Sequence, residues 1–408
     1  MDADSLKLLL DPAGFALLNE LPPYDESESL RLSEQLRAAG HPAELVAAAL
    51  TQSRLRDKAT SKFGAFAADM LFTADGLEQA TRLSVAARHA NRFAQAGIEK
   101  IADLGCGIGA DAMAMAALDR QVLAVDADEV TAAIASVNLR HLPTATVRHA
   151  RAEDTDLSGF DGAWLDPARR SPGRSDSQGR TSRIFDPEAF SPPLSFVTSL
   201  AADLPALGAK LGPALPHEEI PLGAEAQWTS VGGSVVEVAL WWNATARKGV
   251  RRAALVIGRD GGVAEATDID LPEQAVGEIG GFLYEPDGAV IRSGLVTALL
   301  PITTGRLIDP KIAYVTSDVA VSTPLATGWQ VEDVLPFSLK KLRGYLRERN
   351  IGILTIKKRG SAIVPEQLRK QLRLEGSEEA TIVVTKVRGK QVVIMVRPLI
   401  GADVRVAP

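Results

Sequence analysis

A glycine-rich segment gives the strongest chemical signal in the sequence. It reads Asp103-Leu104-Gly105-Cys106-Gly107-Ile108-Gly109-Ala110, follows an apolar run and opens a helical pattern. Glycine is needed where a backbone turns sharply and must approach a ligand without a Cβ in the way. The helix N-terminus that follows supplies unpaired N–H donors and a positive dipole end. We therefore expect Gly105, Gly107 and Gly109 to cradle a nucleotide or nucleoside.

A carboxylate follows this segment at the spacing that nucleotide sites use. Asp126 closes the next apolar run, 21 residues after Gly105, where a carboxylate accepts hydrogen bonds from both ribose hydroxyls. Gly105-x-Gly107-x-x-Ala110 also fits the dinucleotide fingerprint, so the loop alone does not exclude NAD. Asp103 favours S-adenosylmethionine, because a carboxylate two residues before the first glycine meets a cationic group there but would face a pyrophosphate unfavourably.

Another carboxylate ends a later apolar run. Asp166 and Pro167 follow the run 160–165, and a carboxylate at the carboxyl end of a core strand lies in the ligand crevice of an open α/β sheet. Pro167 lacks an N–H and fixes φ, so the backbone leaves the strand rigidly. Asp166 can then accept a hydrogen bond from an exocyclic amine and orient its lone pair. We expect these two residues to be catalytic.

The charge is unevenly distributed, although its total is only −6. The stretch 338–397 holds fifteen Lys and Arg against five acids and carries +10, so the rest of the chain carries −16. An acidic body with a basic end indicates a polyanionic partner, although scattered charge runs are more often solvated faces. Arg169 and Arg170 begin a second Arg-rich stretch, suited to forked phosphate contacts. The candidate substrate-binding cations near the C-terminus are Lys340, Lys341, Arg343, Lys357, Lys358 and Arg359.

The composition excludes several classes of protein. With 46% apolar and 24% charged residues, the 408-residue chain is neither disordered nor fibrous, and its length suggests about two to three domains. No apolar run reaches the ~18 residues of a membrane span, and the first residues lack the pattern of a signal peptide. Cys106 is the single cysteine and the five histidines lack metal-ligand spacing. We expect a cytoplasmic, metal-free protein with no membrane partner.

The short apolar runs predict an α/β fold. Runs at 98–104, 121–126 and 144–149 are separated by helical patterns, as in a doubly wound parallel sheet. Helices are expected over 1–61 and 77–96. The later runs Gln227–Val231, Val235–Trp242 and Arg252–Ile257 suit an antiparallel addition with a turn at Gly232-Gly233.

Four regions are expected along the chain. They are a helical N-terminal extension (1–69), an α/β core (70–258), a variable insert and connecting segment (259–330), and a small basic α+β domain (331–408). Residues 259–281 are rich in Gly, Asp and Glu, which predicts a loop.

Residues 70–212 resemble a class I S-adenosylmethionine-dependent methyltransferase, in the glycine motif, in Asp126 and in Asp166-Pro167. The whole chain resembles actinobacterial methyltransferases that carry a C-terminal THUMP-like domain. The shared phrases are Thr51-Gln52-Ser53-Arg54-Leu55-Arg56, Asp166-Pro167-Ala168-Arg169-Arg170, Tyr284-Glu285-Pro286-Asp287-Gly288 and Leu335-Pro336-Phe337-Ser338. The resemblance implies a Rossmann-like sheet and S-adenosyl-L-methionine as the cofactor, bound by Asp103, Gly105, Gly107, Gly109 and Asp126.

Two motifs depart from that family. The third motif, which often reads Gly-Asp-Ala, is replaced by residues 150–154, so adenine recognition is expected to move to Glu153, Asp154 or backbone groups, with Ala152 and Glu153 as the cofactor-binding candidates. Enzymes that methylate exocyclic amines usually have Pro and an aromatic after Asp-Pro, whereas Ala168 and Arg169 follow here. Either Phe185 supplies the stacking ring or amine methylation is not the reaction.

The sequence therefore predicts a methyltransferase that acts on a base in structured RNA. Methylation of a pyrimidine carbon commonly needs a cysteine nucleophile, and Cys106 lies inside the cofactor loop, so that mechanism is not expected. Two alternatives stay open. One is a non-catalytic RNA-binding protein whose methyltransferase fold senses the cofactor. The other is a methyltransferase acting on protein or a small molecule, with the basic end making subunit contacts.

Overall fold

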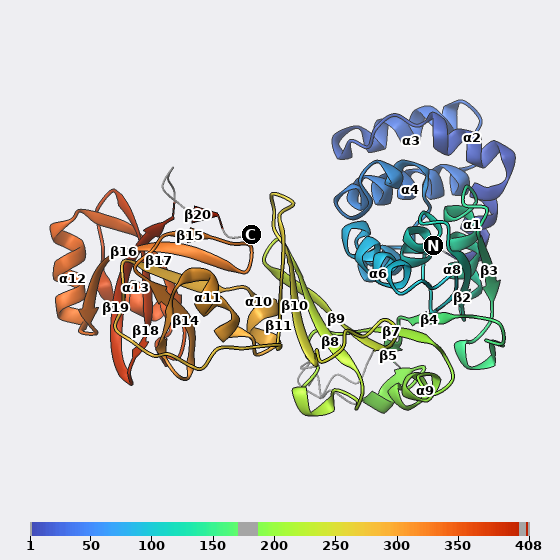
Figure 1. Ribbon diagram of the computed structural model, residues 1–408. Coiled ribbons are helices and arrows are strands. Elements are labelled where there is room, and N and C mark those ends of the chain that lie inside the picture. The colour runs from blue at the N-terminus through green and yellow to red at the C-terminus, as the bar shows by residue number, and fades with distance from the viewer. Residues whose placement is uncertain (1, 170–186, 400–404, 407–408) are drawn as a thin grey trace. The chain divides into compact units, whose positions relative to one another are not determined.

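The computed structural model describes residues 2–169, 187–399 and 405–406. The chain divides into two compact units, one of residues 1–211 with 240–246 and one of residues 212–239 with 247–408. Each unit has its own sheet strands and helices (Figure 1). The expected boundaries at 69, 258 and 330 stay predictions.

Helices precede the first strand, as the sequence predicts. They are capped by side chains such as Asp2 and Asp11, each of which accepts a backbone N–H in the following turn. The helix expected over 77–96 is instead two, because the backbone turns extended at Ala80 and Arg82. The elements are α1 (Ala3–Leu10), α2 (Pro12–Glu20), η1 (Glu26–Glu28), α3 (Ser29–Ala38), α4 (Ala43–Phe63), η2 (Gly64–Asp69), α5 (Ala74–Gln79) and α6 (Leu83–Gln95).

The first unit contains a parallel sheet. Its strands are β1 (Lys100–Leu104), β2 (Gln121–Asp126), β3 (Ala145–His149), β4 (Gly162–Leu165) and β7 (Ala206–Leu211). They lie in the order β7-β4-β1-β2-β3, with every pair parallel. The connecting elements are α7 (Ala110–Ala116), α8 (Glu129–Asn138), η3 (Ala152–Asp154), β5 (Ala168–Arg169), η4 (Pro187–Ala189), β6 (Phe190–Ser191) and α9 (Leu194–Leu200).

The carboxyl edge of this sheet is where a ligand is expected. The chain runs from β1 to β2 on one side, and β4 later pairs with β1 on the other. The crevice of an open α/β sheet lies at the carboxyl ends of the strands where the order reverses in this way. The loops after β1, β2 and β4 therefore meet at the same edge, which confirms the predicted doubly wound sheet.

The second unit begins with strands whose direction differs from the sequence prediction. Its first strands are β8 (Glu225–Val231), β9 (Ser234–Asn243), β10 (Arg252–Ile257) and β11 (Val263–Thr267), β9 being shared with the first unit. The prediction of an antiparallel addition is wrong for β10, which pairs with β8 in parallel. The predicted loop at 259–281 is also wrong in part, because β11 lies within it and pairs antiparallel with β10.

The rest of the second unit is built on a seven-stranded sheet of order β13-β14-β12-β16-β19-β18-β17. Its strands are β12 (Phe282–Pro286), β13 (Arg306–Asp309), β14 (Ile312–Ser317), β16 (Ala326–Pro336), β17 (Ile351–Lys358), β18 (Glu378–Val387) and β19 (Lys390–Pro398). The other elements are η5 (His217–Glu219), α10 (Gly288–Arg292), η6 (Val296–Ala298), α11 (Leu299–Thr303), β15 (Val321–Ser322), α12 (Leu339–Glu348), α13 (Pro365–Leu372) and β20 (Arg405–Val406).

Two apolar clusters cover the opposite faces of strands β18 and β19, and the first of them also includes β17. On one face, Leu342 and Leu346 of α12 and Leu368 and Leu372 of α13 pack on inward residues of the strands. On the other face, alternate residues of β18 and β19 pack on β12 and β14. This arrangement confirms the α+β module predicted at the C-terminal end. Within the described ranges, no helix is long and apolar enough to cross a membrane.

Candidate active site

The three glycines of the loop after β1 have different tasks. All three have positive φ, at 84° for Gly105, 56° for Gly107 and 88° for Gly109, a region that favours glycine. A Cβ on Gly105 would lie 3.0 Å from the carbonyl oxygen of Asp166, and one on Gly109 would lie 3.3 Å from Leu139, just after α8. A Cβ on Gly107 would meet no atom of the described residues within 4 Å. Gly105 and Gly109 thus permit close packing, whereas the space beside Gly107 leaves its backbone accessible, as the prediction of a ligand-binding loop requires.

Asp103 is a buried carboxylate with little hydrogen bonding to compensate its charge. Its residue is 1% exposed, and among the described residues neither carboxylate oxygen accepts a hydrogen bond of normal geometry, although the nearby backbone N–H of Ala112 lowers its pKa in part. Burial raises the pKa of Asp103 well above its usual value, and the charges of Asp111 and Asp166 raise it further. A buried carboxylate in this state is costly unless a cation or donor reaches it. The position therefore fits the cationic end of an S-adenosylmethionine molecule.

Asp126, at the end of β2, is held in place by two backbone groups. Its Oδ2 accepts the N–H of Gly107 at 3.0 Å, and its Oδ1 accepts the N–H of Asp128 at 2.9 Å. Burial raises the pKa of Asp126 despite these hydrogen bonds. Each carboxylate oxygen has about two acceptor sites, so both can still accept a ribose hydroxyl. The orientation of Asp126 is thus fixed before any ligand arrives.

The residues expected near the adenine lie in the turn after β3. Ala152 is buried in η3, and Glu153 is 25% exposed at its side chain. Arg151 Nη2 lies 3.0 Å from Glu153 Oε1. The turn follows β3, which pairs with β2 in parallel, so it belongs to the same sheet edge as Asp126.

Asp166 is paired with a lysine that the sequence reasoning missed. Lys210 Nζ lies 2.5 Å from Asp166 Oδ2 and donates to Thr81 Oγ1 at 3.1 Å. The side chain of Asp166 is 33% exposed and that of Lys210 is 14% exposed. Pro167 is buried. The only signal for Lys210 in the sequence is a charged residue within the apolar run 206–211.

A buried contact between an aspartate and a histidine lies beside these residues. Asp111, in the first turn of α7, has its Oδ1 2.8 Å from His89 Nδ1 on α6, and both side chains are buried. The His89 contact holds the pKa of Asp111 below its usual value although burial opposes this. The ring of His89 lies 4.2 Å from that of Trp164.

The segment before α5 is anchored to the same edge. Gln52 of α4 donates to the carbonyl of Phe72 at 2.7 Å and accepts its N–H at 3.0 Å. Asn138 of α8 accepts the N–H of Leu71 and donates to the carbonyls of Leu71 and Ile108. One asparagine therefore ties this segment to the glycine loop, and the motif containing Gln52 has a structural task.

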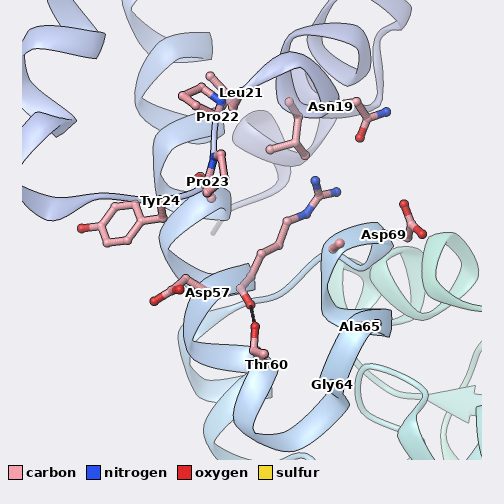
Figure 2. A pocket seen from close by; sticks show the side chains of 14 residues that line it. Asn19, Leu21, Pro22, Pro23, Tyr24, Asp57, Thr60, Gly64, Ala65 and Asp69 are labelled. Atoms are coloured by element: carbon pink, nitrogen blue, oxygen red, sulfur yellow. Dashed lines mark hydrogen bonds between the residues drawn. The ribbon is translucent and has the colours of Figure 1, made fainter.

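A hollow of about 540 Å³ lies elsewhere in the first unit, among the N-terminal helices (Figure 2). Figure 2 shows Pro22, Pro23 and Tyr24 on one wall, with Asp57 and Thr60 of α4 and Asp69 of η2 around it. Among the described residues, none of those predicted to bind cofactor or substrate lines this hollow.

The predicted substrate-binding cations differ in their exposure and in their ion-pair contacts. Lys357 Nζ lies 2.6 Å from Glu285 Oε2, and Arg359 Nη2 lies 3.5 Å from Glu285 Oε1. Lys358 is exposed, and its register with Val384 places it on the face covered by α12 and α13. For Arg169 only the backbone, in β5, is described; Arg170 and Phe185 lie outside the described residues.

The two helices of the C-terminal module carry a group of exposed cations. They are Lys340, Lys341 and Arg347 of α12 with Arg349 directly after it, and Arg369 and Lys370 of α13 with Arg373 directly after it. We call these seven residues the basic helix face. The strands of the module and the turn between β18 and β19 carry five more exposed cations, Lys358, Lys386, Arg388, Lys390 and Arg397. Arg343 is half-buried and donates to the carbonyl of Gln371 at 2.5 Å, which joins the two helices.

Two families match parts of the sequence. Residues 326–398 match the family described as THUMP domain-like, and residues 2–59 match a domain of unknown function, DUF8688. An uncharacterized S-adenosylmethionine-dependent methyltransferase of Mycobacterium tuberculosis strain H37Rv is 32% identical over 348 residues, covering 82% of this chain and 90% of the relative. The counterpart from strain CDC 1551 matches to the same extent.

A solved structure has a similar fold over nearly the whole chain. The crystal structure of a methyltransferase candidate from Porphyromonas gingivalis W83 covers 93% of this chain and all of its own, with a TM-score of 0.69 and 20% sequence identity. The N-terminal helices, the parallel sheet and the C-terminal module are thus parts of one recurring architecture.

Proposed function

Since the chain belongs to the family of S-adenosylmethionine-dependent methyltransferases that carry a THUMP-like domain, we propose that it methylates a base in structured RNA. The observation that carries the chemistry is the meeting of Asp103, Asp126 and Asp166 at the carboxyl ends of β1, β2 and β4. S-adenosylmethionine supplies an activated methyl group when bound.

The chain's own residues then have separate tasks. Asp126 binds the ribose, Asp103 compensates the positive end of the donor, and Ala152 and Glu153 border the adenine. Asp166 accepts a hydrogen bond from the acceptor and directs its lone pair, while Pro167 fixes the backbone beside it. Methyl transfer needs mainly such positioning, which holds the two reactants in line.

The support for RNA as the acceptor is the distribution of charge. The basic helix face presents seven exposed cations on one side of the module, against Glu348 and Glu366 on the same helices. Lysine and arginine side chains arranged in this way bind phosphates without reading the base sequence. Arg169, Arg170, Lys357, Lys358 and Arg359 remain further candidates for substrate contacts.

Transfer of label from the donor tests this proposal. The full-length protein is incubated with S-adenosylmethionine labelled in its methyl group and with total RNA from a strain that lacks the gene. We expect label in a discrete RNA species, and none with the Asp166→Asn variant. Label in protein or in small molecules, with none in RNA, would show a different substrate class. Donor binding without any transfer would show a cofactor-sensing protein.

A further inference from the structure

Asp166 and Lys210 stand side by side because of the register of their strands. Leu165 of β4 pairs with Ala209 of β7 in a parallel ladder, so the next residue of each strand lies at the same edge of the sheet. The Lys210 ammonium is 2.5 Å from Asp166 Oδ2, which makes the contact a charge-assisted hydrogen bond. A second contact to Thr81 Oγ1, at 3.1 Å, directs the lysine from the segment between α5 and α6.

This lysine lies among several carboxylates. Asp103 faces the cluster from β1 and Asp111 from α7, and the charge of Lys210 acts on both of them, lowering the pKa of each. His89 pairs with Asp111 from α6. Burial, with added repulsion from Arg82 and Lys210, lowers the pKa of Lys62 on α4 to about 8. The Lys62 ammonium donates to the carbonyls of residues 77, 78 and 80, so its hydrogen bonds are to the backbone and not to the carboxylates of this cluster.

We propose that Lys210 is a positioning residue for methyl transfer, which keeps the Asp166 carboxylate ionised and aimed at the acceptor. The inference rests on the proposed function, because it requires Asp166 to meet the acceptor. Asp166 remains one-third exposed while Lys210 is mostly buried, so the pair presents its carboxylate, not its ammonium, to the crevice. Without Lys210, Asp166 would face the carboxylate of Asp103 with no cation from β7.

The test compares Lys210→Met with Lys210→Arg, which keeps the charge. Transfer of labelled methyl groups to the RNA fraction is measured as kcat and KM over a range of pH. We expect Lys210→Met to lower kcat at neutral pH by about tenfold or more, as for removal of a charged hydrogen bond, and to move the acid limb of the profile to higher pH. Lys210→Arg should restore both. The affinity for S-adenosylhomocysteine should stay within about threefold, since Asp126 is untouched.

Two controls separate positioning from simple structure. Lys100→Met removes an exposed lysine at the other end of β1 and should leave kcat and the pH profile unchanged. Combined with Asp166→Asn, Lys210→Met should add almost nothing, because residues that act as one unit are not additive. If Lys210→Met does not fold, Lys210→Gln takes its place with the same expectation.

The other possible results distinguish a failure of the role of Lys210 from a failure of the proposed function. A Lys210→Met enzyme with normal kcat, or a loss of the same size with and without Asp166→Asn, would overturn the role of Lys210 and leave the proposed function standing. Full activity of Asp166→Asn would overturn the proposed role of Asp166. If the wild-type protein labels no RNA, the proposed function fails, and this inference fails with it.

Discussion

The carboxyl edge of the first unit and the basic helix face of the second use charge in opposite ways. At the edge, the charges are few and buried: Asp103 is 1% exposed and among the described residues its oxygens accept no hydrogen bond of normal geometry, and Asp111 is paired with a buried histidine. On the helix face, seven cations are exposed and, within the described part of the chain, none of them forms an ion pair with an acid, although Arg347, Arg349 and Arg369 donate to backbone carbonyls. Buried charges give directed, strong interactions with one ligand, whereas exposed cations give screened attraction to any polyanion. The contrast is consistent with the proposal that the first unit holds the reaction site and the second unit binds the substrate.

The largest expected effect comes from Asp166→Asn. The change keeps the shape of the side chain but removes a charge and one acceptor, and a charged hydrogen bond contributes about 1.5–3 kcal/mol, or about a ten- to hundredfold change in rate. Turnover with RNA should fall by that factor, while calorimetry with S-adenosylhomocysteine stays within a few fold. Asp161→Asn, before the start of β4, is the matched control. Undiminished turnover would make Asp166 structural.

The next effect is on donor binding. Asp126→Ala removes the ribose acceptor and should weaken donor binding by about 1–3 kcal/mol. Asp128→Ala, which removes only the N-cap of α8 at Thr131, should change stability and leave donor binding unaltered. Calorimetry with S-adenosylhomocysteine measures both variants. Unchanged affinity in Asp126→Ala, or tighter binding of NAD by the wild type, would contradict the assignment.

A pH effect should distinguish Asp103 from an ordinary surface carboxylate. Burial and the charges of Asp111 and Asp166 raise the pKa of Asp103 in the ligand-free protein. A cationic donor favours the ionised form, so donor binding should release a proton, and affinity should increase with pH until the raised pKa is passed. Calorimetry in two buffers of different ionisation heat measures this proton release.

The variant Asp103→Asn gives the control for that pH effect. It should abolish the proton release, and it should also stabilise the ligand-free protein at neutral pH. The sign follows from linkage: a raised pKa in the folded state means that stability falls as pH increases from the unfolded value, about 3.9, through the folded value. Equal proton release in the variant and the wild type would assign the titration to another group.

A smaller effect is expected from the basic helix face. Replacing Lys340, Lys341 and Lys370 with Gln should lower RNA affinity and flatten the slope of log K against log salt, by roughly 0.7–0.9 for each phosphate that the protein no longer neutralises. Donor affinity should not change. A filter-binding titration over a salt series measures the slope. If this variant keeps the wild-type slope of log K against log salt, the basic helix face does not bind RNA.

The smallest effect is expected from Lys357, Lys358 and Arg359 replaced together with Gln. Lys357 and Arg359 already pair with Glu285, so fewer of these cations are available to phosphate than on the helix face. The slope should therefore flatten less than in the helix-face variant. A larger change here would show that RNA contacts these three residues more than the basic helix face.

Much of the carboxyl edge of the parallel sheet could be predicted because its signals are local in sequence. The glycine loop, Asp126 and Asp166 each follow an apolar strand directly, and a strand's carboxyl end fixes its place in a parallel sheet. Lys210 could not be predicted, because its partner is 44 residues earlier and only the β4–β7 register brings them together. The pairing of Glu285 with Lys357 likewise spans 72 residues. The parallel pairing of β10 with β8 depends on the path of the chain between them, which the residue pattern does not specify.

In this proposal, the carboxyl edge of the first unit carries out catalysis and the basic helix face binds the substrate. The most direct test is a kinetic comparison of two variants on the RNA that accepts the label. For the helix-face variant we expect a higher KM with kcat unchanged, because only binding is weakened, and the difference in KM from the wild type should be largest at low salt, where the lost phosphate contacts matter most. For Asp166→Asn we expect a lower kcat with little change in KM. If both variants change the same constant by the same factor, the two regions do not divide the work in this way.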